Sequence, residues 1–221
     1  MASSARSLEP RTRPDYVAAH FPASSARQYR KGQKIYGPSN RSRTIYLVVA
    51  GKVGISHIAD DGAEVLLEIV LPNELFGESA CFDALRPSEE AVAIEEAKLM
   101  TWAVSDMEDL VVKRPRLAVA LLRVFAERNA ELTSRIGSFA IDTIERRLAR
   151  SLIHLAERLG TPEEDGAVKM MPLTHEMLSH YIGTAREVVT LHMNRFRKQG
   201  YVDYSRRGMV LHGDALRASI S

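Results

Sequence analysis

Residues 173–202 read LTHEMLSHYIGTAREVVTLHMNRFRKQGYV and hold two helical patterns on either side of residues 183–185. Thr174 is a favourable N-cap for the first pattern, and Glu176 places a negative charge in its first turn. Apolar residues then recur at helical spacing: Leu178, Tyr181 and Ile182. Gly183 can adopt the positive φ that a sharp exit from a helix requires.

The second pattern runs from Arg186 to Gln199 and ends at Gly200, which can also take a positive φ. Its apolar residues form one inward stripe: Val189, Met193 and Phe196. Two helices joined by a three-residue turn with glycine predict a helix-turn-helix. The second helix of that motif enters the major groove of DNA.

The outward face of the second helix starts with Arg186, Glu187 and Thr190. An arginine can donate in a fork to guanine O6 and N7, and a glutamate can accept from cytosine N4. From 186 to 207 the basic residues outnumber the acidic ones, although the net charge of the chain is only +2. We therefore expect a local phosphate footprint. The alternative is a solvated amphipathic helix in an ordinary α domain.

The runs 183–189 (GTAREVV) and 195–202 (RFRKQGYV) resemble the DNA-reading element of the Crp–Fnr superfamily of bacterial regulators. The resemblance implies a homodimeric, sequence-specific transcriptional regulator that binds a palindromic operator through a recognition helix at 185–199, with RNA polymerase as a further partner. The expected DNA contacts are Thr174, His175, Thr184, Ala185, Arg186, Glu187, Thr190, Arg195, Arg206 and Arg207. Many family members carry a second arginine where this chain has Leu191, which can touch a thymine methyl but cannot fork to guanine. His192 replaces a usual apolar residue, and we expect a hydrogen-bonded core histidine there.

Length and composition suit a globular protein of two modest domains: 221 residues, 45% hydrophobic and 26% charged. The single cysteine, Cys81, excludes an intrachain disulfide and an iron–sulfur cluster with four thiolates from one chain. It also fits a reducing cytoplasm. No apolar run is long enough to span a membrane, and residues 1–14 lack the apolar core of a secretory signal. We expect a cytoplasmic protein with a disordered tail at 1–14 and no membrane partner.

Short β patterns separated by turn residues fill the region from Tyr16 to Trp102, with a hairpin signal at 60–62 (DDG). They predict a small antiparallel barrel or jelly roll. Four runs resemble the cyclic-nucleotide-binding β-roll of the same superfamily: 46–48 (YLV), 51–53 (GKV), 61–62 (DG) and 75–78 (LFGE).

In relatives that bind cyclic nucleotides, a Gly-Glu pair meets the ribose 2′-hydroxyl and an Arg-Ser pair holds the phosphate. Residues 77–78 match the first pair, whereas residues 85–91 (LRPSEEA) lack the second and place Glu89 and Glu90 at the phosphate position. Carboxylates repel a phosphate, so we expect a different small effector or none. The candidate effector pocket comprises Gly77, Glu78, Arg86, Ser88 and Thr133. A cyclic-nucleotide-responsive regulator remains the alternative, and residues 77–78 also suit a plain tight corner with a buried acid.

Other cofactors are not expected. Haem needs an axial ligand, for which His57 and Cys81 are the candidates among the β patterns. We do not expect an enzyme, since the sequence has no H-x-H cluster for a metal, no nucleophile elbow and no P-loop. A ligand-sensing module that uses its winged helix for protein contacts is the remaining alternative.

A long helical pattern runs from Pro115 to about Phe139 and carries a heptad seam: Leu122, Phe125, Asn129, Leu132, Ile136 and Phe139. Asn129 at an a position favours two strands, because it can pair with its own mate across the axis. A symmetric homodimer is predicted, and the alternative is a helix packed only on its own roll.

The predicted fold class is α+β in three parts after the tail: a β-roll at 15–115, a dimerisation helix and hinge at 116–141, and a winged helix-turn-helix at 142–221. Asp142 is expected to cap a helix at 143–159. A strand at 168–172 and a hairpin wing around 205–208 complete the last part.

Overall fold

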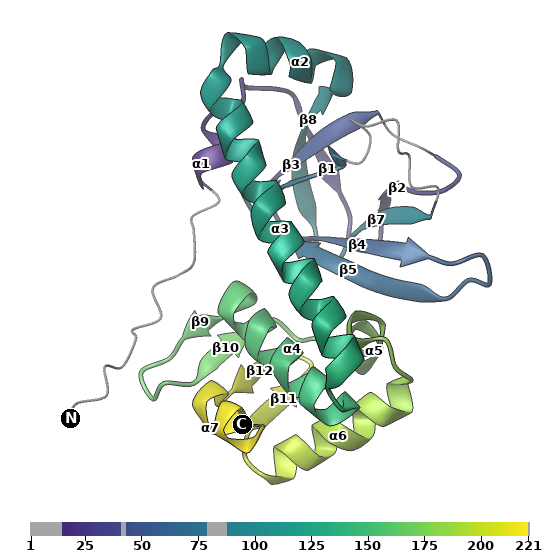
Figure 1. The fold of residues 1–221 in the computed structure, drawn as a ribbon, viewed down its shortest axis with the longest axis vertical. Helices are drawn as coiled ribbons and strands as arrows, with labels where there is room; N and C mark the ends of the chain where they lie inside the picture. Colours follow the sequence, from purple (N-terminus) through teal and green to yellow (C-terminus); the bar gives the residue numbers. More distant parts are fainter. Residues whose placement is uncertain (1–14, 41–42, 79–87, 221) are drawn as a thin grey trace. The chain divides into compact units, whose positions relative to one another are not determined.

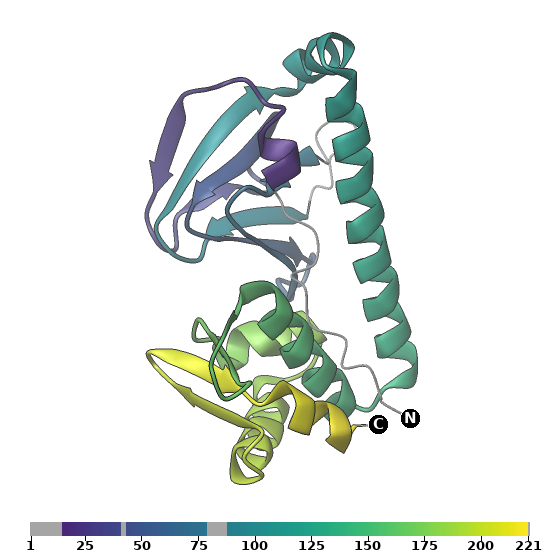
Figure 2. The same ribbon diagram turned by 90° about the vertical axis from the view of Figure 1, so that its left-hand side faces the viewer.

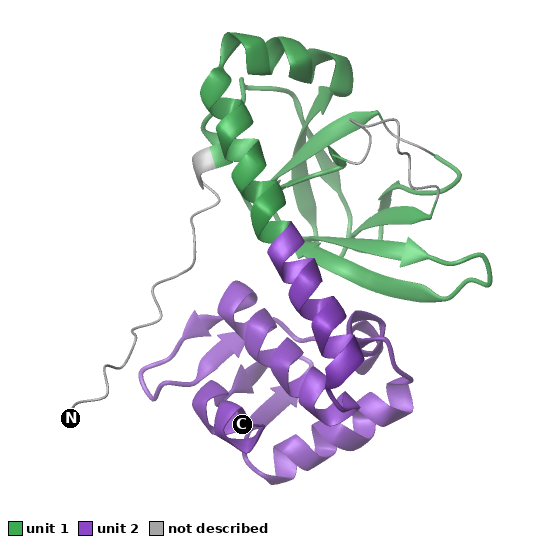
Figure 3. Cartoon of the chain, in the orientation of Figure 1, with its two compact units in different colours: residues 1–128 green, residues 129–221 purple. Residues whose placement is uncertain are grey.

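The structure, a computed structural model, describes residues 15–40, 43–78 and 88–220. The predicted tail at 1–14 lies outside the described residues. The chain forms two compact units, 1–128 and 129–221, and the boundary falls inside one long helix, α3 Pro115–Ile141 (Figures 1 and 3). In the described ranges, no helix is both long and apolar enough to cross a membrane.

The first unit contains a β-roll of two four-stranded antiparallel sheets, in the orders β1-β8-β3-β6 and β2-β7-β4-β5. The strands are β1 Ala26–Tyr29, β2 Lys34–Tyr36, β3 Thr44–Ala50, β4 Val53–Ile58, β5 Glu64–Val70, β6 Leu75–Phe76, β7 Glu89–Ala93 and β8 Ala97–Ala103. The predicted antiparallel roll is confirmed, and the hairpin at 60–62 joins β4 to β5.

Strand β3 contributes to two cores, because successive side chains of a strand point to opposite faces. Tyr46 and Val48 enter the core between the two sheets, to which all eight strands contribute. Ile45 and Leu47 enter a second core, in which helices cover the other face of that sheet (Figure 2). These helices are α1 Asp15–Ala18, α2 Val104–Lys113 and the start of α3.

The sequence does not predict α2 or the last helix, α7 Gly213–Ser219. The N-caps of both helices, Ala103 and His212, make no side-chain hydrogen bond, so the usual start signal is missing. Each helix has one fully buried side chain, Met107 in α2 and Leu216 in α7. Tertiary contacts stabilise these short helices more than local sequence does.

The second unit is a winged helix. Its helices are α4 Ile144–Leu159, α5 His175–Ile182, α6 Arg186–Lys198 and α7. Its antiparallel sheet has the order β11-β12-β10-β9, with β9 Thr161–Pro162, β10 Val168–Met170, β11 Val202–Ser205 and β12 Gly208–Leu211. The hairpin β11–β12 is the predicted wing, and its turn falls at 206–207.

The prediction that Asp142 caps α4 is wrong. Thr143 is the N-cap, and its Oγ1 accepts a hydrogen bond from the N–H of Arg146 at 3.3 Å. The side chain of Asp142 is only 3% exposed and accepts from Ser138 Oγ at 2.6 Å. It also lies 3.3 Å from Arg150 Nη1, so Asp142 ties the end of α3 to α4.

Two glycine turns in the roll differ in the space around them and give a matched test. Gly51 (φ 78°) would place a Cβ 2.1 Å from the carbonyl oxygen of Glu96, whereas Gly62 (φ 84°) has nothing within 4 Å of that position. Gly62→Ala should cost about 1–2 kcal/mol, the cost of a left-handed residue. Gly51→Ala should cost about 3 kcal/mol or more, because the backbone after β7 must also move.

Urea unfolding followed by the fluorescence of Trp102 measures the difference, since Trp102 is the only tryptophan and is buried in the roll. Equal losses in the two variants would contradict the close approach at Gly51.

Candidate nucleic-acid interface

The helix-turn-helix begins as predicted. Thr174 Oγ1 accepts from the N–H of Met177 at 3.0 Å and caps α5. Gly183 ends α5 in the left-handed region (φ 63°, ψ 58°), and the N–H of Thr184 donates to the carbonyl of Ser179 at 3.1 Å. A Cβ on Gly183 would lie 3.0 Å from Cε1 of Phe139. The turn therefore requires glycine both for its φ and for the ring packed against it.

Helix α6 is fixed along its inner side and at its end. Its inner side chains are almost fully buried: Val189, Met193 and Phe196. At the end, the N–H of Tyr201 donates to the carbonyl of Phe196 at 3.0 Å, and the N–H of Gly200 donates to that of Arg197 at 3.1 Å. With Gly200 at φ 76°, this is a Schellman cap. The predicted stripe and stop are both confirmed.

The cations around α6 divide into paired and unpaired groups. Arg195 pairs with Glu145 at 2.9 Å, and Arg197 pairs with Asp203 at 3.0 Å. Four exposed cations form no ion pair with any described residue: Arg186, Lys198, Arg206 and Arg207. These four lie at the two ends of α6 and at the tip of the wing. Their charges are available to an anion.

A hydrogen-bond network joins α6 to α5. The Oγ1 of Thr190 donates to the carbonyl of Arg186 at 2.9 Å. It must then accept from Nδ1 of His175, which lies 2.8 Å away. Burial, and secondly the charge of Arg186, lower the pKa of His175, which favours the neutral ring. The hydrogen bond to Thr190 then places the ring proton on Nδ1. The hydroxyl of Thr190, an expected base contact, therefore has its proton and one lone pair engaged within the chain.

The wing is joined to α6 in the same way. The hydroxyl of Tyr204 in β11 donates to Oδ1 of Asn194 at 3.1 Å. The ring of His175 meets the ring of Tyr204 edge-on at 5.3 Å, and the guanidinium of Arg197 lies 5.0 Å from the centre of the Tyr204 ring. The hairpin β11–β12 lies beside α6 in both ribbon views (Figures 1 and 2). Helix α6 and the wing thus form one continuous surface.

His192 does not follow the prediction of a hydrogen-bonded core histidine. Its Nδ1 is buried and has no hydrogen-bond partner among the described residues. The nearest carboxylate oxygen, from Glu145, is 3.8 Å away, which is beyond hydrogen-bond range. The prediction is wrong because Glu145 instead pairs closely with Arg195.

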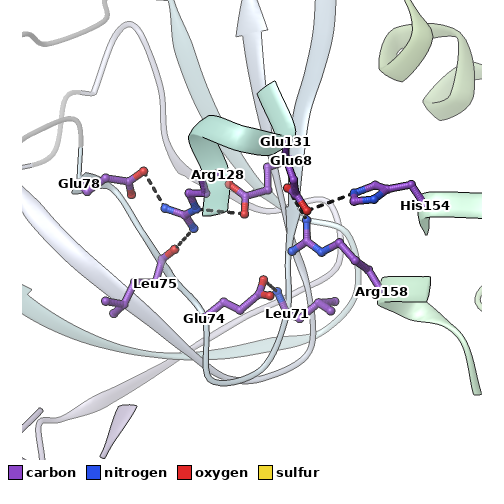
Figure 4. Close-up of polar contacts among 9 residues, drawn as sticks. All are labelled: Glu68, Leu71, Glu74, Leu75, Glu78, Arg128, Glu131, His154 and Arg158. Atoms are coloured by element: carbon purple, nitrogen blue, oxygen red, sulfur yellow. Dashed lines mark hydrogen bonds and ion pairs between the residues drawn. The ribbon is translucent and has the colours of Figure 1, made fainter. Parts of the chain in front are cut away.

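In the roll, the structure places Glu78 against a residue that the sequence does not indicate. Arg128 of α3 donates from Nη1 to Glu78 Oε1 at 2.7 Å and lies 3.3 Å from Glu68 (Figure 4). It also donates to the carbonyl oxygen of Leu75. Burial alone lowers the pKa of Arg128, but the surrounding glutamates outweigh it and raise the pKa above the usual value. Arg128 therefore stays charged inside the roll.

Gly77 has a structural reason to be glycine. Its φ is 85°, and a Cβ there would lie 2.7 Å from the carbonyl oxygen of Thr44. The corner at residues 77–78 is thus needed by the roll itself.

Of the remaining candidates for the effector pocket, Ser88 and Thr133 each have a polar partner within their own unit. Ser88 Oγ lies 3.0 Å from Nδ1 of His57. Thr133 belongs to the second unit, where its hydroxyl donates to the carbonyl of Asn129. Arg86 and Cys81 lie outside the described residues. The described residues contain no group of three or more histidine, cysteine or acidic side chains that could hold a metal ion.

The two glutamates at the predicted phosphate position have partners of their own. Glu89 accepts from the hydroxyl of Tyr36 at 2.6 Å, and Glu90 pairs with Lys34. Burial and then Glu89 raise the pKa of Tyr36 above its usual range, so Tyr36 keeps its proton and remains a donor.

Comparisons with known proteins agree with both units. One family model, "Cyclic nucleotide-binding domain", matches residues 26–114, and another, "Crp-like helix-turn-helix domain", matches residues 146–219. The chain is 27% identical to the "CRP-like cAMP-activated global transcriptional regulator" of Mycobacterium tuberculosis, over 90% of this chain and 88% of that protein. The chain belongs to the Crp–Fnr family. The "Global nitrogen regulator" of Synechococcus elongatus is also 27% identical, over 74% of each chain.

A solved Crp–Fnr transcriptional regulator from Thermus thermophilus superposes with a TM-score of 0.70 at 26% identity, over 89% of this chain and 98% of that one. Crp–Fnr membership confirms the predicted DNA-binding transcriptional regulator and does not favour a module without DNA readout. The relatives are named as regulators and not as enzymes.

The predicted seam of this Crp–Fnr regulator is largely exposed on α3. Leu122 is 67% exposed, Ile136 is 68% exposed, and Leu132 and Phe139 are also exposed apolar residues. Phe139 has contacts within the chain as well, since its ring lies 4.7 Å from the guanidinium of Arg147. Further along α3, Glu131 lies 3.3 Å from His154 and 3.6 Å from Arg158 of α4 (Figure 4).

Arg128→Met tests the buried ion pairs of the Crp–Fnr roll. The variant leaves the carboxylates of Glu68 and Glu78 without their cation, so it should destabilise the roll by about 3 kcal/mol. Arg116→Met, on the exposed side of the same helix, should change stability by less than about 0.5 kcal/mol. Urea unfolding followed by Trp102 fluorescence compares them, and equal midpoints would refute the stabilising role of Arg128.

Proposed function

We propose that two copies of this chain bind a palindromic duplex operator, with one α6 in each of two successive major grooves. The half-sites then lie about one helical turn, roughly 34 Å, apart. One observation carries the proposal: Arg186 and Glu187 are exposed and form no ion pair with any residue that the structure describes, at the start of a helix whose other side is buried.

The residues of the interface have separate roles in this proposal. Arg186 forks to a guanine, and Glu187 accepts from the N4 amino group of a cytosine. Arg206 and Arg207 contact phosphates, which position the protein without reading sequence. The N-terminus of α5 and the turn offer further phosphate contacts through Thr174, His175, Thr184 and Ala185. Two other predicted contacts are already engaged in the chain, Thr190 through its hydroxyl and Arg195 through Glu145.

The unpaired carboxylate of Glu187 argues for sequence readout over general DNA affinity. A carboxylate near the phosphate backbone weakens binding to every sequence by charge repulsion. It becomes favourable only where a base edge offers a donor such as cytosine N4.

The dimer is proposed from the exposed apolar stripe of α3. Leu122, Leu132 and Ile136 recur at heptad spacing and would be covered by the same residues of a second copy. Asn129, also exposed, lies between them and suits a two-stranded seam. In this assembly the proposed domains are the β-roll at 15–115, the dimerisation helix and hinge at 116–141, and the winged helix-turn-helix at 142–221. RNA polymerase is the proposed protein partner, and the cytoplasm the proposed location.

The effector is proposed to be a small molecule in the roll other than cyclic AMP. Glu78 is already paired with Arg128, and Glu89 and Glu90 occupy the stretch where a phosphate would need cations. The similar proteins do not identify the effector, because one of them is named for cyclic AMP and another for nitrogen regulation.

Arg186→Ala and Arg206→Ala form a matched pair of variants. Arg186→Ala should cost about 1–3 kcal/mol on the operator and relax discrimination at one base pair, because a base contact is lost. Arg206→Ala should weaken binding to operator and scrambled duplex alike, because a phosphate contact is lost. The slope of log binding constant against log salt concentration should become shallower by about one.

Fluorescence anisotropy against both duplexes, at several salt concentrations, measures these effects. The operator is first selected from random duplexes with the full chain. The base-reading role of Arg186 is lost if its variant discriminates between the two duplexes as well as the parent does.

Calorimetry with cyclic AMP tests the effector proposal on the full chain. No saturable heat is expected at micromolar ligand, since the carboxylates at 89–90 repel the phosphate. Titration of the same preparation with operator duplex shows that the protein is active. A micromolar dissociation constant for cyclic AMP would establish the cyclic-nucleotide-responsive alternative.

A further inference from the structure

Leu191 is an apolar side chain on the outer face of α6. It is 67% exposed, whereas Val189 and Met193 on the inner face are fully buried. It is the only large exposed hydrophobic residue in the described part of the winged helix, 142–220. An exposed leucine adds little to the core, so the Leu191 side chain is free to contact a partner outside the chain.

The geometry of the helix puts Leu191 on the same side as the proposed base contact Glu187. At about 100° per residue, positions four apart differ by only about 40° around the axis. One helical turn advances about 5.4 Å, and base pairs follow each other every 3.4 Å or so. Leu191 thus lies one to two base pairs from the pair that Glu187 reads.

The polar neighbours of Leu191 already make hydrogen bonds within the chain. Asparagine reads adenine through a paired contact that needs its side-chain oxygen as acceptor. The Oδ1 of Asn194 already accepts from Tyr204. The hydroxyl of Thr190 is also engaged, with His175 and with the carbonyl of Arg186.

We propose that Leu191 is a specificity-determining residue that reads a thymine through its C5-methyl group. This inference rests on the proposed function and adds the class of base that each half-site carries at one position. Among the bases, only thymine presents a methyl group in the major groove, and an apolar side chain recognises it by excluding water from both surfaces. Cytosine, its pyrimidine alternative, has no C5-methyl group, so leucine gains no such apolar contact with it.

The test removes the methyl group alone. In the selected operator, each thymine of a half-site is replaced in turn by deoxyuridine, which keeps every hydrogen-bonding group of thymine. Dissociation constants are measured at one fixed salt concentration for the parent chain and for Leu191→Ala. One position should weaken parent binding by about three- to tenfold, the effect of one buried methyl, and the same change should leave Leu191→Ala unaffected.

Two controls separate this contact from other effects. Leu191→Ala should unfold at the parent's urea concentration, because the side chain is mostly exposed. Leu191→Met, which keeps an apolar side chain of similar size, should retain the sensitivity to deoxyuridine.

The binding measurements separate the role of Leu191 from the proposed binding of an operator. If the parent selects an operator but no deoxyuridine weakens it, or if Leu191→Ala shows the same loss as the parent, Leu191 does not read the methyl group. If the parent selects no operator at all, the proposed function fails and this inference fails with it.

Discussion

The left-handed turn at Gly183 fixes the direction of α6, and the DNA-reading surface depends on that direction. The ring of Phe139 occupies the space where any other residue would carry its Cβ, so the turn is held by packing as well as by φ. Because Val189, Met193 and Phe196 then anchor one side of α6, the opposite side is set. Arg186, Glu187 and Leu191 are among the residues exposed on that side.

Charge pairing within the chain selects which of the cations can serve DNA. The sequence shows a basic segment, but the structure engages Arg195 and Arg197 with carboxylates. Among the described residues, Arg186, Lys198 and the wing arginines have no such partner. The same principle acts in the roll, where Arg128 neutralises Glu78 and Glu68. An effector that engaged Glu78 would have to replace or share that arginine. Binding of such an effector would therefore compete with the ion pair between Arg128 and Glu78.

Local signals in the sequence predicted the elements that depend on them. Thr174, Gly183 and Gly200 marked the ends of α5 and α6, and the alternation of apolar residues marked the strands of the roll. Pairings between distant residues were not predictable. Arg128 lies 50 residues from Glu78, and no periodicity links them. Asp142 and Thr143 are both good N-caps, so the sequence alone does not decide which of them caps α4. In the structure the Asp142 side chain is bound to Ser138 and Arg150, and Thr143 caps the helix. The hydrogen bond between Thr190 and His175 was also not predictable, because it joins residues of two different helices.

In the proposed complex, paired copies of α6 read two half-sites on one face of the duplex. Inserting five base pairs between the half-sites of the selected operator tests it directly, because this rotates one half-site about half a turn from the other. We expect the affinity for this lengthened duplex to fall to that of a duplex with a single half-site. A ten-base-pair insertion should return both half-sites to the same face of the duplex. Undiminished binding after the five-base-pair insertion would contradict the paired-helix account.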